Sequence, residues 1–199
     1  TWLIVPLSWD IDFETNPELT SHFPSTLLEL HIHPDFPCSA WPLLPSNLTT
    51  LVCRAPGLLS SVVSTMIDDH GVQHEVSSLP FDSLPRSITK LDLGLKDLIF
   101  CGPTPPPSSH QSYFPPHLTH LRISKIQLSP ETAKLLPSSL TYLKTANICE
   151  HVCAHLPTGL RTLESYGTLM SPNLIKFLPK SLTSLKMSSF DPSDPWFDC

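Results

Sequence analysis

The sequence predicts a parallel α/β solenoid, a curved stack of short strands joined by short helices or irregular segments. Three observations carry this prediction: one motif recurs along the chain, its spacing is nearly constant, and each copy holds apolar residues at the period of a strand. A short strand cannot bury its apolar face alone, but copies stacked about 4.8 Å apart form a parallel sheet over a continuous core. We therefore expect a single solenoid domain over residues 1–199, forming part of a longer chain.

The repeated motif reads Leu or Phe, Pro, two variable residues, Leu or Ile, two more variable residues, and Leu. Its copies lie at residues 23–30, 44–51, 84–91, 114–121, 136–143, 156–163 and 178–185, and their prolines are spaced by 21, 40, 30, 22, 20 and 22 residues. The spacing of 40 predicts two periods, with a degenerate unit near 62–67. The spacing of 30 predicts one period plus an irregular, Pro-rich insertion at about 101–113.

Each unit is expected to continue from its proline into a strand. Proline has no N–H and favours extended backbone, so it suits the approach to a strand. The last Leu of the motif and the residue two places later, such as Leu91 and Leu93, share one strand face and point into the core. The side chains between them, such as Asp92, form the opposite face, which we call the open face.

Short helices are expected between the later strands. Three segments carry an N-cap residue followed by Pro at the first helical position, namely Asn16–Pro17, Ser129–Pro130 and Ser171–Pro172. The apolar residues Ile148, Val152 and Leu156 recur every four positions, which also favours a helix. The unit is therefore predicted to be a strand, a turn and a short helix or irregular segment on the convex side.

The Leu-x-x-Leu-x-Leu cores, such as residues 88–93, and the Leu-Pro-x-Ser-Leu-Thr starts at 136–141 and 178–183 carry a family resemblance. Over roughly residues 1–190 the sequence resembles leucine-rich repeats, and its Pro-led units are similar to FNIP-type repeats. It departs from the family pattern in one respect: the asparagine expected three residues after the third apolar position is missing from every unit. The resemblance implies a horseshoe whose concave sheet recognises a protein partner.

The open face, which the resemblance makes the concave one, carries the candidate binding residues. They are Asp92, His120, Arg122, Tyr142, Lys144, Glu164, Tyr166 and Lys186. Neighbouring units stack about 5 Å apart, so Asp92 is expected to pair with Arg122, and both Lys144 and Lys186 with Glu164. This row can serve only to keep the sheet soluble, or it can bind a protein, with aromatic and Arg side chains as anchors. The sequence leaves both interpretations open.

The six cysteines do not form a compact disulfide framework, and Cys53 stands at a core position of its strand. We therefore expect thiols in a reducing, cytoplasmic compartment, although Asn47 begins a glycosylation sequon. Cys149, His151, Cys153 and His155 contain donors that suit zinc. On a helix, however, the cysteines share one face and the histidines another, so we expect neither a metal site nor a cofactor.

Composition and motifs limit the function classes. The net charge of −6 argues against nucleic-acid binding, and no apolar run approaches the length of a membrane span. No nucleophile elbow, phosphate-binding loop or zinc-protease motif is present, so we expect a non-enzymatic protein-interaction module. The alternative is an assembly protein that packs against its own copies or other subunits through the solenoid ends. The open strand edge at residues 2–5 and the aromatic tail at about 189–199 favour that alternative.

Overall fold

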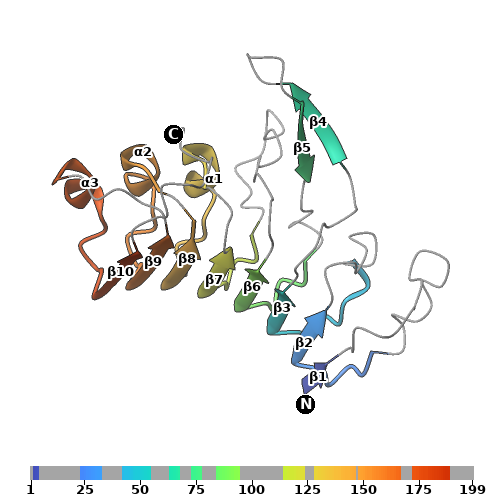
Figure 1. Cartoon of the computed structure of the whole chain (residues 1–199). Coiled ribbons are helices and arrows are strands. Elements are labelled where there is room, and N and C mark those ends of the chain that lie inside the picture. Colours follow the sequence, from blue (N-terminus) through green and yellow to red (C-terminus); the bar gives the residue numbers. More distant parts are fainter. Residues whose placement is uncertain are drawn as a thin grey trace.

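The computed structural model describes residues 2–4, 23–32, 42–54, 63–67, 73–77, 84–94, 114–123, 128–146, 148–166 and 172–188. Eight strands form one parallel sheet in the order β1-β2-β3-β6-β7-β8-β9-β10, an open row that runs from the N-terminal to the C-terminal unit (Figure 1). These strands are β1 (Trp2–Ile4), β2 (Glu29–Ile32), β3 (Thr50–Arg54), β6 (Lys90–Gly94), β7 (His120–Ile123), β8 (Tyr142–Thr145), β9 (Thr162–Tyr166) and β10 (Ser184–Ser188). The predicted parallel solenoid is therefore confirmed.

The last leucine of each motif occupies the same register position from strand to strand. In the order of the sheet these leucines are Leu30, Leu51, Leu91, Leu121, Leu143, Leu163 and Leu185, each opposite the next. The first six are at most 2% exposed, whereas Leu185, on the edge strand β10, is 38% exposed. One column of leucines thus forms the spine of the core, and its last member lies on β10, the edge strand among the residues that the structure describes.

The position two residues later is also buried, as the strand period requires. Ile32, Cys53, Leu93 and Ile123 fill it in the first four motif-bearing strands. Thr145 and Ser165 fill it in β8 and β9, and these polar residues are 0% and 1% exposed. The Ser165 hydroxyl donates to the carbonyl of Ala146 in the preceding unit at 2.9 Å, so its burial leaves the oxygen paired.

The predicted degenerate unit near 62–67 is wrong. That segment is β4 (Val63–Ile67), which pairs antiparallel with β5 (Gln73–Ser77) in a separate two-stranded sheet, coloured green in Figure 1. Strand β3 pairs directly with β6, Leu51 opposite Leu91. The spacing of 40 residues is therefore one period with an inserted hairpin, and no strand of the repeat sheet is missing between these two units.

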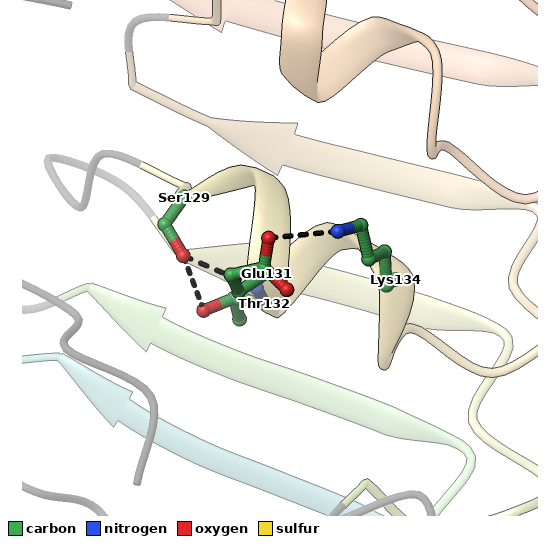
Figure 2. A network of polar contacts seen from close by, with 4 residues as sticks. All are labelled: Ser129, Glu131, Thr132 and Lys134. Atoms are coloured by element: carbon green, nitrogen blue, oxygen red, sulfur yellow. Dashed lines mark hydrogen bonds and ion pairs between the residues drawn. The ribbon is translucent and has the colours of Figure 1, made fainter. Parts of the chain in front are cut away.

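Three short helices precede the last three strands and lie on one side of the sheet (Figure 1): α1 (Pro130–Lys134), α2 (Glu150–Cys153) and α3 (Pro172–Phe177). The N-cap predicted for α1 is confirmed, because the Ser129 hydroxyl accepts from the backbone N–H of Thr132 at 3.1 Å (Figure 2). Glu131 in the first turn pairs with Lys134 in the last at 2.7 Å, which suits the helix dipole. In α2, Val152 is buried together with the flanking Ile148 and Leu156, as their spacing predicts.

Serine, threonine and asparagine side chains at the strand entrances tie five of the units to the unit before them. The threonine just ahead of a strand donates to a main-chain carbonyl of the preceding unit, through Thr49, Thr89, Thr119, Thr141 and Thr183, at 2.9 to 3.2 Å. The residue two places earlier does the same through Asn47, Ser87, Ser139 and Ser181. These bonds lie at the entrance of the strand, whereas the family pattern places its asparagine after the strand. They explain why the units stack regularly without that asparagine.

Several expectations lie outside the described residues. They are the Pro-rich insertion at 101–113, the aromatic tail at 189–199 and the Asn16–Pro17 helix start. The division of the chain into one solenoid with these two segments accordingly stays a prediction.

Candidate interaction surface

The open face from β6 to β10 is built by strand register alone. Asp92, Arg122, Lys144, Glu164 and Lys186 lie opposite one another on successive strands and form a central column. Their neighbours in each strand are the buried leucines and third-position residues, so the pleat directs these charged side chains to the other face. A second column, two residues earlier in each strand, contains Lys90, His120 and Tyr142.

The central column forms ion pairs between units, and both predicted pairings are confirmed. Arg122 lies 3.6 Å from Asp92. Glu164 is shared between two ammonium groups, with Lys144 at 3.2 Å from Oε2 and Lys186 at 2.8 Å from Oε1. Two of the three cations are more exposed than the carboxylates they pair with: the Asp92 and Glu164 side chains are 15% and 13% exposed, whereas Arg122 is 36% and Lys186 is 70% exposed. Lys144, at 13%, is as buried as Glu164. A molecule that approaches this face therefore meets cations before it meets carboxylates.

Aromatic rings flank the central column. The rings of His120 and Tyr142 stack with centroids 5.6 Å apart and planes inclined by 23°. On the other flank, the Lys144 ammonium lies 4.8 Å from the centre of the Tyr166 ring, within the range of a cation–π contact. Tyr166 itself is 43% exposed. The charged column thus runs between one stacked aromatic pair and one exposed tyrosine.

These contacts move the pKa values of the side chains involved. The pKa of Glu164 is lowered, first by its hydrogen bond from Lys186 and then, against an opposing effect of burial, by Lys144. The pKa values of both lysines are raised, that of Lys186 by Glu164 and that of Lys144 first by hydrogen bonding with Tyr166. The Glu164 carboxylate and the ammonium groups of both lysines therefore stay charged around neutral pH.

The pKa shifts of the two stacked side chains favour their neutral forms. Burial, with a contribution from the charge of Lys90, lowers the pKa of His120, and burial also raises the pKa of Tyr142. At neutral pH the imidazole of His120 is therefore uncharged and the phenol of Tyr142 keeps its proton. The face presents rings at these positions and no additional charge.

All eight candidate residues lie on this one face, and five contacts join them: Asp92–Arg122, His120–Tyr142, Lys144–Glu164, Glu164–Lys186 and Lys144–Tyr166. Lys90 belongs to the same face by strand alternation but was not among the candidate binding residues; it is exposed and close enough to His120 to affect its titration. Its position two residues before Asp92 in the same strand would have identified it. Val52 lies opposite Asp92 on β3, so strand alternation places it on the open face, but it is only 8% exposed. Val52 thus interrupts the central column between His31 of β2 and Asp92 of β6.

The Cys149–His155 segment separates its donors as the helical argument predicts. Cys153 is buried and Cys149 packs against the core, whereas His151 and His155 are exposed. Burial, together with Cys149 and Glu150, raises the pKa of the Cys153 thiol to about 12. In the part of the chain that the structure describes, no three His, Cys, Asp or Glu side chains gather as a metal ion would need.

Asn47, the first residue of the sequon, occupies the same turn position as Ser87 and Ser139. Its side-chain amide nitrogen, the atom to which a glycan would be attached, donates to the Ser25 carbonyl at 3.0 Å.

Among the described helices, none is long and apolar enough to cross a membrane.

The strand stack, the leucine column and the convex helices define the fold of a leucine-rich-repeat solenoid. A solved leucine-rich-repeat-containing protein, LegL7 from Legionella pneumophila, is similar in structure, with a TM-score of 0.53 and 18% sequence identity. The match covers 95% of this chain and 64% of that protein, so the chain spans less than two thirds of its length. The circular leucine-rich-repeat protein CroV588 also matches, with a TM-score of 0.28, 18% identity, and 82% of this chain against 34% of that one.

The sequence comparisons add nothing to this assignment of the fold. A scan against protein-family models found no match, and a search of curated proteins found no relative. The similarity to FNIP-type repeats therefore stays a prediction.

Proposed function

We propose that the chain is a non-enzymatic protein-interaction module that binds a protein partner on the open face between β6 and β10. The observation that carries the proposal is the row of register-aligned side chains from Asp92 to Lys186, flanked by the His120–Tyr142 stack and by Tyr166. Core packing does not require these groups, because the leucine spine lies on the other face of the same strands. Open solenoid sheets are the extended surfaces on which such proteins bind others.

The contacts on this face favour binding over mere solubility. The ion pairs and the cation–π contact hold Lys144, Glu164 and Tyr166 in fixed positions before a partner arrives. Side chains that are already ordered lose less conformational entropy on docking, and tyrosine and arginine are the residue types enriched at binding hot spots. Tyr142, Tyr166 and Arg122 are therefore the anchors that we assign.

The experiment has two steps. A photo-reactive phenylalanine analogue is placed at Tyr142 or Tyr166, and, as a control, at Lys134 on the exposed side of α1. Cross-linked proteins specific to the tyrosine positions are identified, purified and titrated against the variants. We expect Tyr142→Ala and Arg122→Ala each to weaken binding by about 1–3 kcal/mol, and Lys134→Ala to be near neutral.

The proposal fails if the purified partner binds these open-face variants as tightly as the parent chain while convex or terminal substitutions abolish binding. In that case the assembly function takes its place. One observation favours assembly: at the β10 end of the sheet, Leu185, Ile175 and Phe177 are 38%, 55% and 48% exposed. Light scattering separates the two, because end-to-end packing raises the mass with concentration and Leu185→Lys would reverse the rise.

A further inference from the structure

The open face from β6 to β10 has the opposite charge to the rest of the chain. Its strand positions carry four cations, Lys90, Arg122, Lys144 and Lys186, and two carboxylates, Asp92 and Glu164, a surplus of two positive charges. The whole chain has a net charge of −6. Positive charge is therefore concentrated on the surface that the fold leaves open.

Exposure makes the surplus larger for a partner than the count implies. Both carboxylates, and Lys144 that pairs with one of them, are no more than 15% exposed, whereas Arg122 is 36% exposed, Lys186 is 70% exposed and Lys90 is exposed. The remaining polar groups of the second column, the hydroxyls of Tyr142, Thr162 and Ser184, are uncharged and can donate as well as accept a hydrogen bond. A partner that pairs with this face must supply acceptors and negative charge.

The size of the surface selects the kind of partner. Lys90 and Lys186 lie on strands that are four steps apart, about 19 Å at the spacing of parallel strands, which an extended peptide of roughly six residues spans. The surplus of two charges is small compared with the roughly six to ten phosphates that a nucleic-acid site neutralises. The flanking rings of Tyr142 and Tyr166 offer apolar contact beside the charges, which suits a peptide that alternates acidic and apolar residues.

We propose that the partner of the open face is an extended acidic peptide segment, whose carboxylates bind Lys90, Arg122 and Lys186 across β6 to β10. This inference rests on the proposed function and specifies the chemistry of its partner. The Lys144–Glu164 pair stays intact in the complex, because Glu164 holds each lysine through a different oxygen and can release Lys186 while it keeps Lys144.

The test uses fluorescein-labelled octaglutamate and octaglutamine, titrated by fluorescence anisotropy at low and at physiological salt. Octaglutamate is expected to bind and to weaken as salt rises, and octaglutamine not to bind. The double variant K90Q/K186Q should weaken octaglutamate binding about tenfold, since it removes the surplus charge. The double variant K134Q/K180Q removes the same charge from α1 and from the turn before β10, and should change affinity less than about twofold. Thermal unfolding verifies that both variants are folded.

Three results would overturn the inference: no binding of octaglutamate, equal weakening by the two double variants, or tighter binding of a single-stranded oligonucleotide of equal charge through the same lysines. The inference and the proposed function fail differently. A partner that is weakened by Tyr142→Ala but is insensitive to salt and to K90Q/K186Q leaves the open-face function standing and removes only the acidic partner.

Discussion

At the scale of the residue, two hydroxyl positions decide how the units are joined. The serine of the Leu-Pro-x-Ser-Leu-Thr start and the threonine that ends it both bond to carbonyls of the preceding unit. Each such bond contributes on the order of 1 kcal/mol. The carbonyl that a threonine hydroxyl bonds, such as that of Thr119, also accepts from two backbone N–H groups, so the hydroxyl strengthens a main-chain link that is already present. In the sequence these residues indicate the approach to a strand, and in the structure their hydroxyls also form hydrogen bonds between units.

Adjacent serines in one turn test this role. Ser139 donates to the carbonyls of Leu118 and Pro116 at 2.8 and 2.9 Å, whereas Ser138 is exposed. We expect Ser139→Ala to lower the free energy of unfolding by about 1 kcal/mol and Ser138→Ala to lower it by less than about 0.5 kcal/mol, measured by urea denaturation. Equal effects would mean that the bonds contribute nothing beyond the turn itself.

His120 provides a test by titration. Its folded-state pKa lies below the usual 6.5, through burial first and the Lys90 charge second. The unfolded chain therefore takes up this proton at a higher pH than the folded chain does. The contribution of His120 to stability is present above pH 6.5 and is lost as the pH falls below it, because the unfolded state is then protonated first.

Nuclear magnetic resonance of the imidazole should show this shift directly, and Lys90→Gln should move the His120 pKa upward by removing the repulsive charge. Lys134→Gln, on α1, should leave it unchanged. A His120 pKa at or above 6.5 in the parent chain would contradict the contact geometry of this face.

At the scale of the element, the burial of the leucine spine depends on having a unit on each side. Leu121 and Leu185 occupy the same motif position, but they are 0% and 38% exposed, because β10 is an edge strand. Leu121→Ala should cost about 2–5 kcal/mol of unfolding free energy, as buried leucine truncations do, and Leu185→Ala about 1 kcal/mol or less. Urea denaturation measures both. Similar costs for the two would show that a further segment covers Leu185.

The inserted hairpin gives a second prediction at this scale. Because β3 pairs directly with β6, strands β4 and β5 contribute no member to the repeat sheet. Replacing residues 62–78 with a short Gly–Ser linker should leave the thermal midpoint within about 3 °C of the parent value. A drop of about 10 °C would mean that the hairpin packs against the solenoid and protects it.

At the scale of the whole molecule, the sequence predicted the parallel stack because its leucines and prolines mark each unit. Leu91, Leu121 and Leu143 fall at the same place in their motifs, so their burial and register follow from the strand period. The direct pairing of β3 with β6 could not be predicted from the sequence. Residues 63–67 favour a strand but lack the motif's Pro and Leu, so nothing sets their register in the sheet, and pairing with nearby residues 73–77 closes a much shorter loop.

The candidate surface was predictable to the same degree. Columns and ion pairs follow from register, and so Asp92–Arg122 and Lys144–Glu164–Lys186 could be placed from the sequence alone. The contact of Lys144 with the Tyr166 ring could not, because it crosses diagonally between strands and depends on side-chain rotamers. The burial of Val52 could not be predicted either, since period-two alternation places it on the exposed side.

We propose that alternate residues of one strand have different roles: one side chain packs in the core of the solenoid, and the next binds the partner on the open face. Tyr142 and Leu143 in β8 test it most directly, through both the free energy of unfolding and the affinity for the purified partner. The account predicts that Tyr142→Ala weakens binding by about 1–3 kcal/mol and costs about 1 kcal/mol or less in stability, while Leu143→Ala costs about 2–5 kcal/mol in stability. Equal losses of stability at both positions, with the partner's affinity unchanged by Tyr142→Ala, would contradict it.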